Sequence, residues 1–345
     1  MKTVVGAPVV AVMLGVAAGA WAAPAVPKPE SIDIPDGQGG IGYDDLQYAP
    51  ELGRILVPAG RTGRLVLLDP ATKALVSVGG FSSAASFAGG HGQGTTSAFE
   101  LPGGRIVATD RGSKTLKLVS VKTGSIVASI KLVAAPDYVR AVPSTRQIWV
   151  TEPSGKQIEV LRLDEGAHPG LAHLANIAVP DGPESLVVDP QRGRAYSHTW
   201  ADQTFAIDVK ARKVVSTWRN GCRKSRGIAL DAKRGFLFAG CAEGKATVVD
   251  LASGHVVSTA ETGPDVDSIA FSSTLGHLYV PSGGRAELSI FEVAGKGKLT
   301  LLGRAPTGAD AHTAAFDPAT SSVFVGTPEH GVVLVIRDPF PPSAR

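Results

Sequence analysis

Seven polar or ionisable side chains recur at one position of a repeated sequence pattern. They are Asp44, Thr95, Tyr138, Glu184, Arg226, Asp267 and His312, and successive members lie 41 to 51 residues apart. Carboxylates and imidazoles bind divalent cations and exchange protons, whereas arginine holds carboxylate or phosphate groups. The chain therefore has the side chains of a polar binding site, provided that the fold brings these distant positions together.

Each of these residues begins a copy of the same strand pattern. Residues 226–260, 267–293 and 312–338 each contain an apolar strand, a polar turn, a second strand, a glycine-rich turn and a third strand. A fourth strand, such as 74–80 or 255–261, follows in the complete copies. Because this period is typical of four-stranded propeller blades, and because 41 Gly and 24 Pro punctuate the chain, we predict an all-β protein.

The predicted fold is a seven-bladed β-propeller of four-stranded antiparallel blades. The approximate blade ranges are 42–81, 94–136, 137–182, 183–225, 226–265, 266–310 and 311–340 plus 30–36. The last copy stops after three strands, so we expect the alternating segment 30–36 to close the last blade as its N-terminal strand and to cover two sheet edges. The alternative is that 24–40 is a disordered leader.

The repeats also carry a family resemblance. The second strands end in the sequences WVTE (149–152), YVPS (279–282) and FVGT (324–327), which are partial matches to Tyr-Val-Thr-Asn. The chain after residue 23 thus resembles the YVTN-type seven-bladed propellers, including the YncE-like periplasmic proteins. The resemblance implies the architecture only, because this scaffold serves enzymes, binding proteins and surface proteins alike.

The N-terminus has the pattern of an export signal. Residues 1–23 start with one lysine, continue as an uncharged apolar stretch and contain the small-residue pattern Ala20-Trp21-Ala22 near their end. We expect this signal peptide to be removed, leaving 24–345 as a single propeller that is periplasmic or secreted and has no transmembrane anchor. The alternative is that the N-terminal stretch is itself a membrane anchor.

Two cysteines, Cys222 and Cys241, flank the predicted strands 227–230 and 236–240. In antiparallel neighbours the start of one strand lies beside the end of the other, within the reach of a disulfide. An oxidising compartment would keep that bond formed. We predict a structural disulfide, with two unrelated buried thiols as the alternative.

The predicted ligand site is the mouth of the central channel, which the first strand of each blade lines. The expected ligand-binding residues are Asp44, Asp45, His91, Tyr138, Glu184, Arg226, Asp267 and His312. His91 lies in the glycine-dense segment 88–96, which either lets backbone approach a ligand or is a pliable connection. The competing interpretation is that polar residues at the mouth are simply solvated. Trp149, Trp200 and Trp218 are expected to pack within the blades.

Known catalytic signatures such as G-x-S-x-G and His-Glu-x-x-His are absent from the sequence. We therefore predict that the mouth binds a small polar or anionic ligand, or a protein partner, without converting it. A third possibility is a protein-interaction platform on the outer edges or on the opposite face. With a net charge of +3 and no long basic run, nucleic acid is not an expected partner, and we expect a monomer.

The enzymatic alternative is a lactonase- or lyase-type activity, which rests on resemblance to related propellers. It implies His91 or His312 as the catalytic acid or base and Arg226 as the holder of an oxyanion. A divalent metal would be its cofactor, with Asp44, Glu184, Asp267 and His312 as candidate ligands. The channel residues include no asparagine, which departs from the metal-dependent lactonase pattern.

Overall fold

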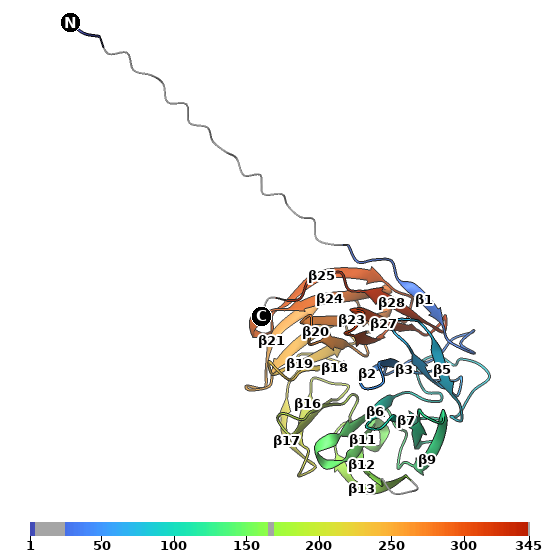
Figure 1. Cartoon of the computed structure of the whole chain (residues 1–345). Coiled ribbons are helices and arrows are strands. Elements are labelled where there is room, and N and C mark those ends of the chain that lie inside the picture. The colour runs from blue at the N-terminus through green and yellow to red at the C-terminus, as the bar shows by residue number, and fades with distance from the viewer. Residues whose placement is uncertain (4–24, 165–168, 344–345) are drawn as a thin grey trace.

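Each copy of the sequence repeat forms one four-stranded antiparallel sheet. In the computed structural model, which describes residues 1–3, 25–164 and 169–343, the seven sheets surround a common axis as the blades of a β-propeller (Figure 1). The predicted fold class is confirmed. Most of the predicted signal peptide lies outside the described residues, and no helix in the described part of the chain is long and apolar enough to cross a membrane.

The strands run outward from the axis in sequence order in six of the blades. The first three blades contain β2 (Gln47–Ala49), β3 (Arg54–Pro58), β4 (Leu65–Leu68) and β5 (Leu75–Val78); β6 (Ala98–Leu101), β7 (Arg105–Asp110), β8 (Thr115–Ser120) and β9 (Ser125–Lys131); and β10 (Val139–Val142), β11 (Gln147–Glu152), β12 (Gln157–Asp164) and β13 (Gly170–Ala178). The 3-10 turns η1 (Pro143–Thr145) and η2 (Pro153–Gly155) connect strands of the third blade.

The remaining blades repeat this order, apart from the last. They contain β14 (Val187–Asp189), β15 (Arg194–His198), β16 (Thr204–Asp208) and β17 (Lys213–Trp218); β18 (Ser225–Asp231), β19 (Phe236–Cys241), β20 (Lys245–Asp250) and β21 (His255–Glu261); β22 (Ala270–Ser272), β23 (His277–Ser282), β24 (Glu287–Val293) and β25 (Leu299–Pro306); and β26 (Thr313–Asp317), β27 (Ser322–Thr327), β28 (Val332–Arg337) and β1 (Glu30–Asp33). The turns η3 (Gly283–Arg285) and η4 (Gly295–Gly297) lie in the sixth blade.

Aspartates at the ends of inner strands close the first hairpin of several blades. The carboxylates of Asp189, Asp231 and Asp317 accept hydrogen bonds from backbone N–H groups two or three residues further on. Aspartate favours such turns because its short side chain replaces a backbone acceptor. These turns mark the face of the propeller opposite to the starts of the inner strands.

The N-terminal strand completes the seventh blade, as the sequence predicts. β1 pairs antiparallel with β28, with Ile32 opposite Val333 and Glu30 opposite Val335 (Figure 1). The strand is shorter than the expected segment 30–36. Its pairing covers the edge that β28 would otherwise expose.

The apolar core is divided among the contacts between neighbouring blades. One cluster, for example, joins Ile55 and Val57 of β3 to Phe324 of β27 and Val333 of β28. Similar clusters join the other adjacent blades, so each sheet packs both faces on its neighbours. Burial of a side chain such as Phe324 contributes about 1.5–3 kcal/mol. This packing fixes the radial positions of the inner strands.

The predicted disulfide is present. Cys222, before β18, is bonded to Cys241, the last residue of β19, and their Cα atoms are 5.2 Å apart. Both residues are buried with Ala239. The bond ties the loop that leads into the fifth blade to the second strand of that blade.

Candidate functional site

The starts of the inner strands gather at one mouth of the channel. Asp44, Glu184, Asp267 and His312 come shortly before β2, β14, β22 and β26, and Arg226 is the second residue of β18. The Nη1 atom of Arg226 lies 3.6 Å from Oδ2 of Asp267. Ser268 donates its backbone N–H to the carbonyl of His312, at 2.9 Å, which fixes the spacing of the sixth and seventh blades.

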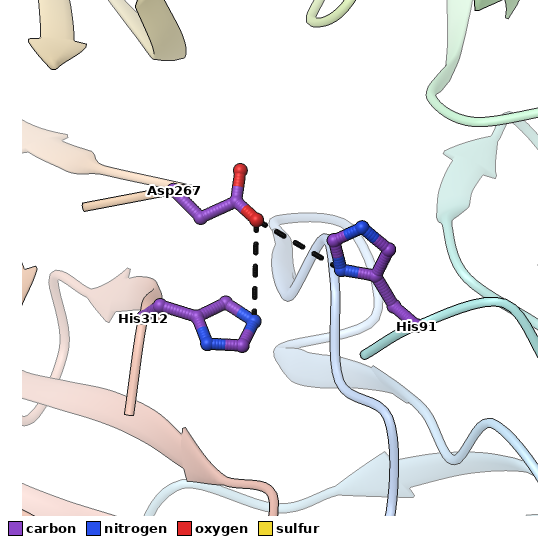
Figure 2. Close-up of side chains that lie close together, drawn as sticks. All are labelled: His91, Asp267 and His312. Carbon is purple, nitrogen blue, oxygen red and sulfur yellow. Dashed lines mark ion pairs between the residues drawn. The ribbon is translucent and has the colours of Figure 1, made fainter. Parts of the chain in front are cut away.

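Two histidines face one carboxylate at the centre of this mouth. Nδ1 of His91 lies 3.8 Å and Nε2 of His312 lies 4.0 Å from Oδ2 of Asp267. Figure 2 shows both rings turned toward that carboxylate. Nδ1 of His91 is also 4.0 Å from Oδ1 of Asp44. The structure thus brings together residues from four distant parts of the chain.

The glycine-dense loop carries His91 to the axis by packing backbone on backbone. A Cβ atom added to Gly42 would lie 2.3 Å from the Gly90 carbonyl oxygen and 3.0 Å from Cα of His91. At Gly94, where φ is +68°, an added Cβ would lie 1.9 Å from the Gly60 carbonyl oxygen. Only glycine permits such close approach. The glycines of this segment therefore position the histidine.

Arg111 holds the same loop from the second blade. Its side chain donates hydrogen bonds to the Asp137 carboxylate, to the Pro136 carbonyl at 2.9 Å and to the His91 carbonyl at 3.3 Å. Its Nη2 atom is 3.6 Å from Oδ2 of Asp44. Sequence reasoning missed Arg111. Its position directly after β7, the second strand of its blade, could have indicated it. In each blade the turn between the second and third strands lies on the same face of the propeller as the start of the inner strand.

Acidic groups outnumber basic ones at the mouth. Four buried carboxyl groups, those of Asp44, Asp137, Glu184 and Asp267, face the guanidinium groups of Arg111 and Arg226. Burial raises the pKa of Asp44 to about 8, against the opposing effect of Arg111. Burial, together with Asp137 and Asp267, also raises the pKa of Glu184 well above its usual value. A cation at the mouth would favour the ionised form of these groups.

Several buried polar atoms of the mouth have no hydrogen-bond partner. They are Oδ2 of Asp44, Nδ1 of His91, Oε2 of Glu184 and both carboxylate oxygens of Asp267. An unsatisfied buried polar atom costs about 1–3 kcal/mol, so native proteins contain few of them. Their concentration at one point indicates a site that a ligand, an ion or water completes.

An open cavity adjoins His91, one of the residues with a partnerless atom. It has a volume of about 460 Å³ and includes His91, Arg111, Asp137 and Trp200 in its lining. Trp200 is 58% exposed, and the Arg226 guanidinium lies 5.5 Å from its ring centroid. The expectation that Trp200 packs within a blade is therefore wrong, because its loop after β15 turns the indole toward the cavity. Trp149 is fully buried, as predicted.

Comparisons with known proteins identify the architecture. The chain is similar to a chain in "Crystal Structure of Mitotic Checkpoint Complex", with a TM-score of 0.75 and 13% identity over 98% of each chain. It is also similar to a chain of "Kuenenia stuttgartiensis Hydrazine Synthase", with a TM-score of 0.70 and 13% identity over 88% of this chain and 96% of that one. The shared feature is the propeller fold. No protein-family model and no curated protein sequence matches the chain.

Two of the predicted site residues, Asp45 and Tyr138, make contacts within and between the blades and not with the group around Asp267. Both carboxylate oxygens of Asp45 accept hydrogen bonds from Arg140, and further bonds come from Ser97 and Gln47. The ring of Tyr138 packs in the core between the third and fourth blades, with the Arg140 guanidinium 5.3 Å from its centroid. The residues that gather around the mouth are Asp44, His91, Glu184, Arg226, Asp267 and His312.

Proposed function

We propose that this protein is an exported propeller of the YVTN or YncE-like type that binds a small polar ligand at the channel mouth without converting it. The observation that carries the proposal is the group of partnerless buried polar atoms beside an open cavity. The cavity volume lies within the range of about 300–1,000 Å³ that is common for small-molecule sites. The Cys222–Cys241 disulfide supports an oxidising, extracytoplasmic compartment.

The charges and shape of the mouth restrict the chemistry of the ligand. Since burial raises the pKa of Asp44 to about 8 and also raises the pKa of Glu184, the guanidinium groups of Arg111 and Arg226 favour an anionic group, whereas a cationic centre is favoured when its binding ionises these carboxyl groups. The exposed face of Trp200 offers a flat apolar wall. We therefore expect a ligand with a flat or apolar part that contacts Trp200 and a polar part that reaches Asp267.

A thermal-shift screen of the purified protein tests this proposal. The panel contains small amines, amino acids, hydroxy acids and lactones, each with and without divalent cations. We expect at least one class to raise the melting temperature of the wild type, since a ligand at 100 times its Kd stabilises by about 2.7 kcal/mol. Trp200→Ala should abolish the shift, and the surface variant Val256→Ala should retain it. A panel without any shift, or a shift that survives Trp200→Ala, would contradict the proposal.

The arrangement of His91 favours a second candidate, a lactonase- or lyase-type reaction. Its Nδ1 atom has no hydrogen-bond partner and its ring lines the cavity, as a general acid or base requires. Turnover of any lactone in the panel by the wild type, and its loss in His91→Gln with ligand binding retained, would support this candidate. Binding without turnover would favour the non-catalytic function.

A further inference from the structure

We infer that His91, His312 and Asp267 bind one divalent transition-metal cation of the Zn²⁺ type at the channel mouth, and that this ion anchors the polar part of the ligand. The role of the ion in anchoring rests on the proposed function, whereas binding of the ion does not. The two imidazoles and the carboxylate offer one ligand atom each, and these atoms all lie within 4.8 Å of one another.

The separations are close to those of a coordination shell. With metal–ligand bonds of about 2.1 Å, two ligand atoms of a tetrahedral ion are about 3.4 Å apart. The observed distances from Oδ2 of Asp267 to the two imidazole nitrogens are 3.8 and 4.0 Å. Small rotations of the side chains would bring all three atoms onto one ion.

The ligand atoms of Asp267 and His91 are free to accept a cation. Both Asp267 oxygens and Nδ1 of His91 are buried and have no hydrogen-bond partner. Arg226 lies 3.6 Å from Asp267 as an ion pair, without a hydrogen bond to it. Burial of a carboxylate without any hydrogen bond is unfavourable. A bound cation removes this cost because it neutralises the carboxylate and coordinates the free nitrogen.

His312 must lose one hydrogen bond when the ion binds. Its Nε2 atom lies 3.2 Å from the Tyr43 carbonyl oxygen, to which it donates in the metal-free protein. Coordination through Nε2 requires the proton of the neutral imidazole to move to Nδ1.

The chemistry of the donors selects the class of metal. Two imidazoles and a carboxylate suit Zn²⁺, Co²⁺ or Ni²⁺, whereas Ca²⁺ and Mg²⁺ prefer shells of oxygen. Three protein side chains leave a position for an exogenous group, as in zinc sites that bind substrate. His91 also lines the cavity beside Trp200, so that position is within reach of a molecule bound there.

Titration calorimetry on the protein after dialysis against EDTA tests the inference. We expect one Zn²⁺ to bind per chain. Addition of Co²⁺ in place of Zn²⁺ should give the visible absorption bands of a four-coordinate Co²⁺ ion. His91→Ala and His312→Ala should each weaken Zn²⁺ binding by more than about 100-fold. Loss of a residue that only hydrogen-bonds to a metal ligand weakens metal binding by at most about 100-fold, so a larger loss indicates direct coordination. His255→Ala, an exposed histidine of β21, is the matched control and should bind as the wild type does. Circular dichroism confirms that each variant is folded.

Other outcomes would overturn the inference. They are no Zn²⁺ binding by the folded wild type, a stronger response to Ca²⁺ than to Zn²⁺, or binding that both histidine variants retain. These outcomes are separate from failure of the proposed function, because the metal titration contains no organic ligand. If the protein binds Zn²⁺ but no compound of the ligand panel shifts its melting temperature, the metal site is supported and the proposed ligand binding is rejected. A ligand-induced shift that is as large in metal-free protein as in Zn²⁺-loaded protein would keep the ligand site and reject the anchoring role of the ion.

Discussion

Arg140 and Asp45 form a bidentate ion pair between the third and the first blade, with Nη1–Oδ2 and Nη2–Oδ1 distances of 2.6 and 3.0 Å. Both side chains are almost completely buried. Arg140 belongs to the third blade and Asp45 precedes the first strand of the first blade, so the pair spans the second blade. Arg140 also lines a separate cavity of about 300 Å³ near the hairpin turns of the opposite face. The pair thus stands between the two ends of the channel.

Removing one member of this pair should be costly. Arg140→Met leaves the Asp45 carboxylate buried and unpaired, and we expect the free energy of unfolding to fall by about 3–5 kcal/mol. Urea denaturation followed by tryptophan fluorescence measures the loss. The double variant Arg140→Met with Asp45→Asn should lose less than Arg140→Met alone. Equal losses in the single and double variants would show that the carboxylate is not the source of the cost.

The position of His91 should depend on Gly42. In Gly42→Ala the new methyl group would meet the Gly90 carbonyl at 2.3 Å, so the loop that carries His91 must move. We expect Zn²⁺ binding to weaken by about 10- to 100-fold, as measured by calorimetry. Gly92→Ala is the control in the same loop, because an added Cβ there meets nothing within 4 Å. Similar affinities for the two variants would contradict this role of Gly42.

The disulfide should stabilise the fifth blade. Replacing both Cys222 and Cys241 by alanine opens a loop with a sequence separation of 19, which corresponds to about 3 kcal/mol in the chain-entropy model. Urea denaturation with and without dithiothreitol measures this loss. The reductant should destabilise the wild type and leave the double variant unchanged. A wild type that is insensitive to complete reduction would contradict the prediction.

His198 should make the protein less stable in acid. Burial lowers its pKa from 6.5 to about 4, with the Phe238 carbonyl acting weakly against this. The unfolded chain therefore binds the proton first as the pH falls. The free energy of unfolding should decrease by about 3 kcal/mol between pH 6.5 and pH 4 through this group alone, with no contribution above pH 6.5.

The variant His198→Gln isolates that effect. Glutamine can still contact Thr204, which lies 2.8 Å from Nδ1 of the imidazole, but it does not titrate. Denaturation curves at a series of pH values should show a shallower acid slope for the variant than for the wild type. Parallel curves would mean that His198 is protonated equally in the folded and unfolded states.

The sequence predicts the blades well because each one is a local pattern. Strand alternation and turns at Asp189 or Asp317 recur with a nearly constant period, and an incomplete last copy requires a further strand. The Cys222–Cys241 bond follows from the same local geometry. Sevenfold repetition also brings Asp44, Glu184, Asp267 and His312 to one face, since each lies shortly before an inner strand.

Side-chain pairing between blades could not be predicted from the repeat. Arg140 lies inside a strand, and only the three-dimensional ring brings it to Asp45. Arg111 and Trp200 lie in turns between second and third strands, whose lengths and directions vary from blade to blade. His91 reaches Asp267 through a long loop held by close backbone contacts, which sequence periodicity does not describe.

The pairing of β1 with β28 also determines when folding can finish. Six sheets consist of strands that follow one another along the chain and need no distant partner, but the seventh waits until residues near 337 have been synthesised. Until then residues 30–33 have no strand to join. A circular permutant that joins the segment after Phe340 to the segment before Glu30 through a linker, and that is opened between two other blades, keeps the buried Asp338 and Phe340 and makes this last pairing local. It should refold faster to the same ring.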